Sequence, residues 1–111
     1  MIEITFFEDS SGAVCGFHFK GHAGYAAHGS DIVCAAVSVL SINTINSIEE
    51  FTDEKFKSRV SEGEAYFELA GSRHSDDAVL LLNSLVLGVN GIRQEYGNKY
   101  IAIRTKRRQE E

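Results

Sequence analysis

The sequence predicts a single α+β domain over residues 1–111, with a mainly antiparallel sheet and two helices. Apolar and polar residues alternate in five short segments, which is the pattern of strands with one buried face. Four of these segments form two pairs joined by short polar turns, and two longer segments are apolar at helical spacing. The order strand, strand, helix, strand, strand, helix, strand favours an α+β domain. Because most strands have a polar face, we favour two layers over a three-layer α/β/α sandwich.

The first hairpin is predicted over residues 2–6 and 13–20. Ile2, Ile4 and Phe6 alternate with polar residues, and a turn rich in Asp, Ser and Gly follows at residues 8–12. Cys15 and Phe17 share one face of the second strand. Cys15 is therefore expected in the core.

The first helix is predicted from about residue 32 to residue 50, and its side chains carry no charge for about four turns. Ala35, Val39 and Ile42, together with Ala36 and Leu40, form an apolar stripe at helical spacing and are expected to face the sheet. A solvated helix face normally carries Lys and Glu. The uncharged face therefore indicates further cover, by the other helix or by a second subunit.

The second half of the chain repeats this order. Residues 55–60 and 64–69 form a hairpin, a helix begins near Ser75 and ends at Gly91 or Gly97, and residues 100–103 form the last strand. The basic residues from Arg104 to Arg108 are expected to be a solvated strand end and tail.

The composition is typical of an ordinary globular protein, with 43% hydrophobic and 24% charged residues. The N-terminus has no signal-peptide pattern, and residues 32–48 are too short and too polar to cross a bilayer, so we expect a cytoplasmic protein. A net charge of -5 argues against direct binding to nucleic acid and suits a basic partner. Both cysteines are expected to be reduced thiols.

The chemistry concentrates in residues 21–40, where a glycine-rich loop leads into the first helix. Asp31, or Ser30 before it, is a good N-cap, which places Cys34 in the first helical turn. There the helix dipole is expected to lower the pKa of the thiol. A nucleophilic cysteine needs a base, and His22 at the end of the second strand is better anchored than His28 in the loop.

Spacing alone leaves other interpretations open. Free cysteine is most often a small buried hydrophobe, and histidines in loops are most often solvated. A zinc site is disfavoured because C-x-x-C and H-x-x-x-H spacings are absent. Asp31 could orient His22, but it is better explained as the helix cap.

The runs G-H-A-G-Y-A from Gly21 and G-x-D-I-V-C-A-A-V-S from Gly29 resemble the signature of the ribosomal-processing cysteine protease family. The likeness extends over nearly the whole chain. It implies a cysteine protease without a cofactor, with Cys34 as nucleophile and His22 as base. Asp31 and Ser38 match polar positions beside the nucleophile.

The resemblance also implies a substrate and a partner. The substrate is the N-terminal extension of a large-subunit ribosomal protein, number twenty-seven, with apolar and aromatic residues before the cut, and the enzyme is expected to form a homodimer. Three glycines, Gly21, Gly24 and Gly29, would let the loop open for the peptide and close on it. Backbone N–H groups at the helix start would stabilise the oxyanion. The rivals are a non-catalytic ribosome-assembly module and a thiol-dependent enzyme other than a protease.

Overall fold

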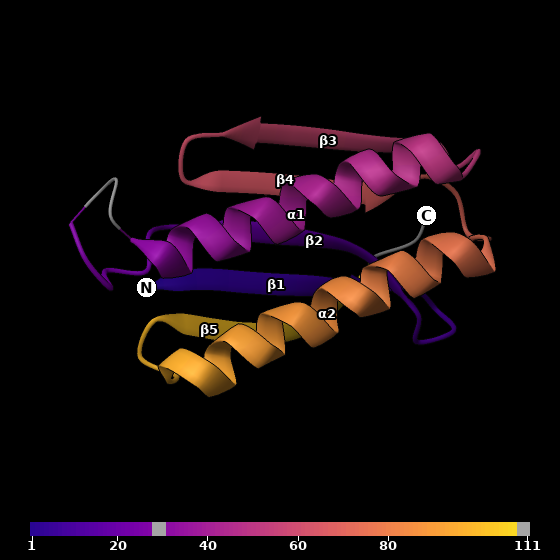
Figure 1. The fold of residues 1–111 in the computed structure, drawn as a ribbon. Helices are drawn as coiled ribbons and strands as arrows, with labels where there is room; N and C mark the ends of the chain where they lie inside the picture. Colours follow the sequence, from indigo (N-terminus) through magenta and orange to yellow (C-terminus); the bar gives the residue numbers. More distant parts are fainter. Residues whose placement is uncertain (28–30, 109–111) are drawn as a thin grey trace.

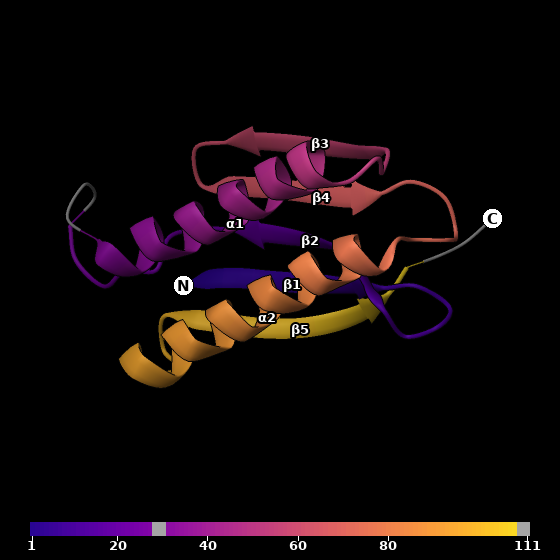
Figure 2. The same cartoon turned by 45° about the vertical axis from the view of Figure 1, so that its right-hand side comes forward.

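The computed structural model describes residues 1–27 and 31–108, and it contains a five-stranded sheet with two helices packed on it. The elements are β1 (Ile2–Glu8), β2 (Val14–Lys20), α1 (Ile32–Phe51), β3 (Phe56–Ser61), β4 (Glu64–Leu69), α2 (Asp76–Tyr96) and β5 (Ile101–Arg107). Both helices lie on the same face of the sheet (Figures 1 and 2). The predicted element order and the two-layer α+β architecture are confirmed, and the three-layer alternative is wrong.

The strand order is β3-β4-β2-β1-β5. The pairs β1–β2, β2–β4 and β3–β4 are antiparallel, whereas β1 and β5 run parallel. We expected the last strand to end at residue 103, but it continues to Arg107 because β5 pairs with the whole length of β1. Most of the basic segment therefore belongs to the sheet.

The core lies between the sheet and the helices. The side chains that alternate toward the helices are buried, while their neighbours face the open side of the sheet. Cys15 is fully buried, as predicted. The largest fully buried side chains come from both layers and include Phe6, Phe17, Phe67, Ile48, Leu82 and Leu85.

The predicted buried stripe of α1 is wrong for Ala35, Val39 and Ile42, which are exposed, although Leu40 packs against the core. Val39 is 66% exposed and Ile42 is 43% exposed, while the residues that α1 buries are Val33, Val37, Ser41, Thr44, Ile45 and Ile48. The buried hydroxyls of Ser41 and Thr44 donate hydrogen bonds to backbone carbonyls of the same helix. A polar residue can therefore take a core position on α1, and in a helix without charge the apolar pattern could not select the buried face.

The two helices pack closely where Gly88 of α2 faces Leu40 of α1. A Cβ atom on Gly88 would lie 3.0 Å from Leu40 Cδ1.

By length and composition α1 could also cross a membrane, with a mean hydropathy of 1.5. A core helix passes the same test, and α1 has a face packed into this core.

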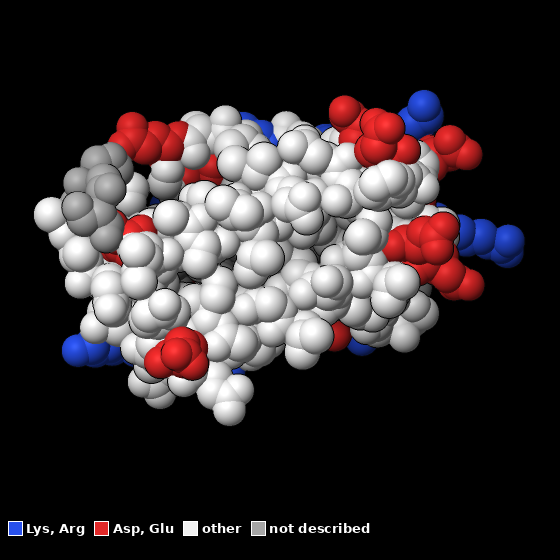
Figure 3. All heavy atoms as spheres, in the orientation of Figure 1, with Lys and Arg blue, Asp and Glu red and all other residues white. Residues whose placement is uncertain are grey.

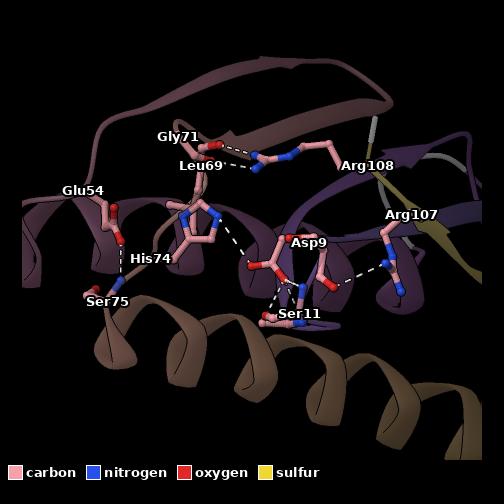
Figure 4. Close-up of polar contacts among 11 residues, drawn as sticks. Asp9, Ser11, Glu54, Leu69, Gly71, His74, Ser75, Arg107 and Arg108 are labelled. Atoms are coloured by element: carbon pink, nitrogen blue, oxygen red, sulfur yellow. Dashed lines mark hydrogen bonds and ion pairs between the residues drawn. The ribbon is translucent and has the colours of Figure 1, made fainter. Parts of the chain in front are cut away.

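A polar cluster joins the β1–β2 turn to the segments around the start of α2 and the end of β5 (Figure 4). The Asp9 carboxylate is buried and accepts hydrogen bonds from Ser11 and Ala13. The side chain of His74 is buried, and its Nε2 atom lies 3.7 Å from Asp9 Oδ2. Arg108 donates to the backbone carbonyls of Leu69 and Gly71. These contacts fix the end of the sheet that is remote from Cys34.

Candidate active site

Cys34 lies in the first turn of α1 and is half-buried. Asp31 is the N-cap, as predicted, and its Oδ1 atom accepts hydrogen bonds from the backbone N–H groups of Val33 and Cys34, both at 3.0 Å. The second carboxylate oxygen accepts a hydrogen bond from the Tyr25 N–H at 3.1 Å. Asp31 therefore fixes both the helix start and the loop that precedes it.

The chain beyond β2 brings the His22 segment to the cysteine. Gly21 follows β2 directly, and the residue after His22, Ala23, is buried. The Ala23 N–H donates a hydrogen bond to Cys34 Sγ at 3.1 Å. Cys34 and His22 line the same cavity. Strand β2 and helix α1 thus place two residues that are twelve positions apart in the sequence at one cavity.

The cavity has a volume of about 500 Å³ and lies between the start of α1 and the β3–β4 turn. Part of its lining is apolar, from Ile2, Phe19, Val37, Ile42, Val60 and Ala65. Its polar lining includes Ser38 and Ser41 of α1, Glu62 and Glu64 of the hairpin, and Lys20 at the end of β2. The space next to the thiol can therefore accept an extended chain with apolar side chains.

The electrostatics of Cys34 differ from the sequence-based expectation. Burial raises the pKa of the Cys34 thiol, the hydrogen bond from Ala23 opposes this, and the Asp31 carboxylate raises the pKa further. Burial alone would raise the pKa of Asp31 too, but hydrogen bonds from Cys34, Tyr25 and Val33 hold it below its ordinary value. Asp31 is thus a negative charge beside the sulfur, and the expected lowering of the Cys34 pKa by the helix dipole is wrong.

The expected oxyanion donors also need correction. The N–H groups of Val33 and Cys34 donate to the Asp31 carboxylate, so the cap engages two of the helix-start donors that were expected to stabilise an oxyanion. The N–H group of Ala23 is instead the donor that contacts the sulfur.

The other predicted site residues are distributed as follows. Ser38 lines the cavity and is exposed. Gly21 and Gly24 both have positive φ angles, of 101° and 72°. Gly29, together with His28 and Ser30, lies outside the described residues. Within residues 1–27 and 31–108, no three His, Cys, Asp or Glu side chains are grouped as metal ligands would be.

The β3–β4 turn was not foreseen as part of the site. Gly63 accepts a hydrogen bond from the Gly21 N–H at 2.9 Å, and Glu62 and Gly63 both line the cavity. The sequence shows a turn at these residues. Their position beside His22 depends on the pairing of β4 with β2, which the sequence pattern did not reveal.

A half-buried thiol at a helix start, in a cleft that a histidine also lines, on a two-layer α+β scaffold, defines a candidate cysteine hydrolase. The family model of the cysteine protease Prp matches residues 1–102. The chain therefore belongs to the Prp family of cysteine proteases, and the predicted family and enzyme class are confirmed.

Individual relatives support the same assignment. The ribosomal processing cysteine protease Prp of Bacillus subtilis is 27% identical over 101 residues, which cover 86% of this chain and 90% of that protein. The fold is also similar to that of the essential ribosomal processing protease Prp from S. aureus with a covalently linked product peptide, with a TM-score of 0.87 and 27% identity. That match covers 96% of this chain and all of the other. The same protease with a substrate peptide gives a TM-score of 0.82 at 26% identity.

Proposed function

We propose that this protease removes the N-terminal extension of a large-subunit ribosomal protein, number twenty-seven, with Cys34 as nucleophile and His22 as general base. One observation carries the proposal. Cys34 and His22 line the same cavity, and the Ala23 N–H beside His22 donates a hydrogen bond to Cys34 Sγ. The names of the related proteins support ribosomal processing, and the S. aureus complexes support a peptide substrate.

Because burial and Asp31 raise the pKa of Cys34, the resting form of the site is the protonated thiol. His22 takes the proton from Sγ as the sulfur attacks the scissile carbonyl carbon, and a tetrahedral intermediate forms. The C–N bond then breaks, and His22 returns the proton to the leaving amine. Water, deprotonated by His22, attacks the thioester, which releases the extension as a carboxylic acid and regenerates the thiol.

The substrate class follows from the cavity. Its apolar lining, which includes Phe19, Val37 and Val60, suits the apolar and aromatic residues expected before the cut. The acidic chain, with a net charge of -5, suits a basic ribosomal precursor.

The test is cleavage of a synthetic peptide that spans the extension and the first mature residues of the precursor, with the product identified by mass spectrometry. We expect one cut in the wild-type reaction and at least a hundredfold loss of kcat in Cys34→Ala and in His22→Ala. A folded wild-type protein that binds the peptide without cutting it would favour the ribosome-assembly module. Turnover of a small thioester but of no peptide would favour a thiol enzyme of another kind.

We further propose that the protein is a cytoplasmic homodimer without direct contact to nucleic acid. The outer surface of the two helices carries few charges, and the acidic and basic side chains lie mainly around its margin (Figure 3). Val39 of α1 and Leu87 of α2 are 66% and 76% exposed. A second copy of the chain is the occupant that would cover this helical face.

Light scattering at micromolar concentration should give twice the chain mass of 12.2 kDa. Leu87→Glu should shift the protein to the monomer, because it places a charge within the helical face. Val60→Glu, an equivalent change at an exposed strand position, should leave the dimer intact. A wild-type monomer, or an unchanged Leu87→Glu dimer, would contradict this interface.

A further inference from the structure

The turn between β3 and β4 packs against the His22 imidazole at Gly63. Gly63 has a φ angle of 75°, in the region that glycine adopts most readily. A Cβ atom on Gly63 would lie 3.1 Å from His22 Nε2 and 3.5 Å from its Cε1. The histidine ring therefore occupies the space next to the Gly63 backbone that a side chain would need.

A backbone hydrogen bond also joins the β3–β4 turn to the residue that precedes His22. The Gly21 N–H donates a hydrogen bond to the Gly63 carbonyl at 2.9 Å. Gly63 therefore contacts both the His22 ring and the backbone of the residue before it. Gly21 is itself confined, because a Cβ atom there would lie 2.6 Å from the carbonyl oxygen of Met1. The backbone that carries His22 is thus fixed between the start of β1 and the β3–β4 turn.

Other turn glycines show that a positive φ angle alone does not explain this contact. Gly12 and Gly71 have φ angles of 87° and 78°, and nothing lies within 4 Å of a Cβ atom built on either. Of these three turn glycines, only Gly63 has the side chain of another residue in the space that its own side chain would fill. The residue that fills this space is the proposed general base.

We propose that Gly63 is a positioning residue for His22: the bare turn sets the distance and angle at which the imidazole faces the cavity that holds Cys34. This inference rests on the proposed role of His22 as the base. A proton transfer from Sγ requires the two groups to approach within hydrogen-bond distance, and a misplacement of about 1 Å can cost about a hundredfold in rate. A side chain at residue 63 displaces the ring from its place or forces the turn away from it.

The test compares Gly63→Asn with Gly12→Asn. Asparagine tolerates a positive φ angle better than other side chains, so the backbone cost is similar in the two variants, and only Gly63→Asn puts a Cβ atom against the imidazole. We expect Gly63→Asn to lower kcat at least tenfold with KM changed less than threefold, and to shift the acidic limb of the kcat–pH profile. Gly12→Asn should keep kcat within twofold of the wild type.

A measurement on the wild-type protein keeps the proposal testable if Gly63→Asn does not fold. Nuclear Overhauser effects should connect the Gly63 Hα protons to the Cε1 and Cδ2 protons of His22. Their absence would overturn the proposal, as would equal kcat values in Gly63→Asn and Gly12→Asn. If His22→Ala retains full activity, the proposed dyad fails. If His22→Ala loses activity but Gly63→Asn keeps the wild-type kcat, the dyad stands and this inference alone is wrong.

Discussion

The backbone N–H of Ala23 lies 3.1 Å from Cys34 Sγ, and this contact joins the segment of the proposed base to the proposed nucleophile. Ala23 is 4% exposed and Cys34 is half-buried, so the hydrogen bond is partly buried. It lowers the thiol pKa, while burial and the Asp31 carboxylate raise it, with a net increase. The sulfur therefore rests as a thiol with a donor in place for the negative charge that develops on reaction.

Alkylation should distinguish the two cysteines. Cys34 is half-buried at the cavity, whereas Cys15 is fully buried in the core, so iodoacetamide should react with Cys34 first. Because the Cys34 pKa is raised, its rate should still be climbing at pH 9, where an ordinary thiol begins to level off. Peptide mass spectrometry of samples quenched between pH 6 and 10 would measure this, and a faster Cys15 would contradict both assignments.

Asp31→Asn should make the Cys34 thiol more acidic. The amide keeps an oxygen that can cap α1, but it removes the negative charge that helps to raise the Cys34 pKa. We expect the alkylation profile to move to lower pH, with a loss of stability of about 1 kcal/mol, because the amide NH2 that replaces Oδ2 cannot accept the hydrogen bond from the Tyr25 N–H. Glu62→Gln is the matched control, because it also removes one carboxylate from the cavity lining. An unmoved Asp31→Asn profile would show that Asp31 does not set the thiol pKa.

Gly16→Ala should destabilise the sheet. Strand β2 lies between β1 and β4, and a Cβ atom on Gly16 would lie 2.5 Å from the backbone oxygen of Phe67 and 3.3 Å from the Phe7 ring. The backbone oxygen belongs to a paired strand and cannot move aside freely, so we expect a loss of about 1 to 3 kcal/mol in urea denaturation. Gly91→Ala is the control, because nothing lies within 4 Å of a Cβ atom there. A Gly16→Ala protein as stable as the wild type would contradict the β2–β4 register.

Asp9 should contribute to acid sensitivity. Its burial alone would raise its pKa, but hydrogen bonds from Ser11 and Ala13 hold the pKa below its ordinary value, with a smaller contribution from His74. A lowered pKa means that the charged carboxylate stabilises the fold above its ordinary pKa, and that this stability is lost as pH falls through the lowered value.

Asp9→Asn should therefore be less stable than the wild type at pH 7, by about 1 kcal/mol, and the difference should shrink on acidification. Urea denaturation from pH 7 to pH 2.5 measures it, with Asp53→Asn as an exposed control. A constant difference across this range would show that Asp9 is not the group that titrates.

Local sequence was sufficient for much of the fold. Alternation predicted each strand, and helical spacing with the cap residues predicted both helices, because these patterns follow from the geometry of one element at a time. Asp31 as N-cap and Cys15 as a core residue followed from the same local rules. The parallel β1–β5 pair was missed, because pairing between the two ends of the chain leaves no local pattern.

The sequence by itself determined the element order, the two-layer architecture and the motif that contains His22 and Cys34, because all three are written in spacing and residue type. The tertiary structure decided which face of α1 is buried, since no charged face of this helix indicates which side is exposed to solvent. It also decided the state of the thiol, because burial and the Asp31 carboxylate raise the Cys34 pKa more than the hydrogen bond from Ala23 lowers it. Strand order, finally, brought the β3–β4 turn beside His22, since β4 pairs with β2 and the Gly21–Gly63 hydrogen bond continues that pairing past the strand ends.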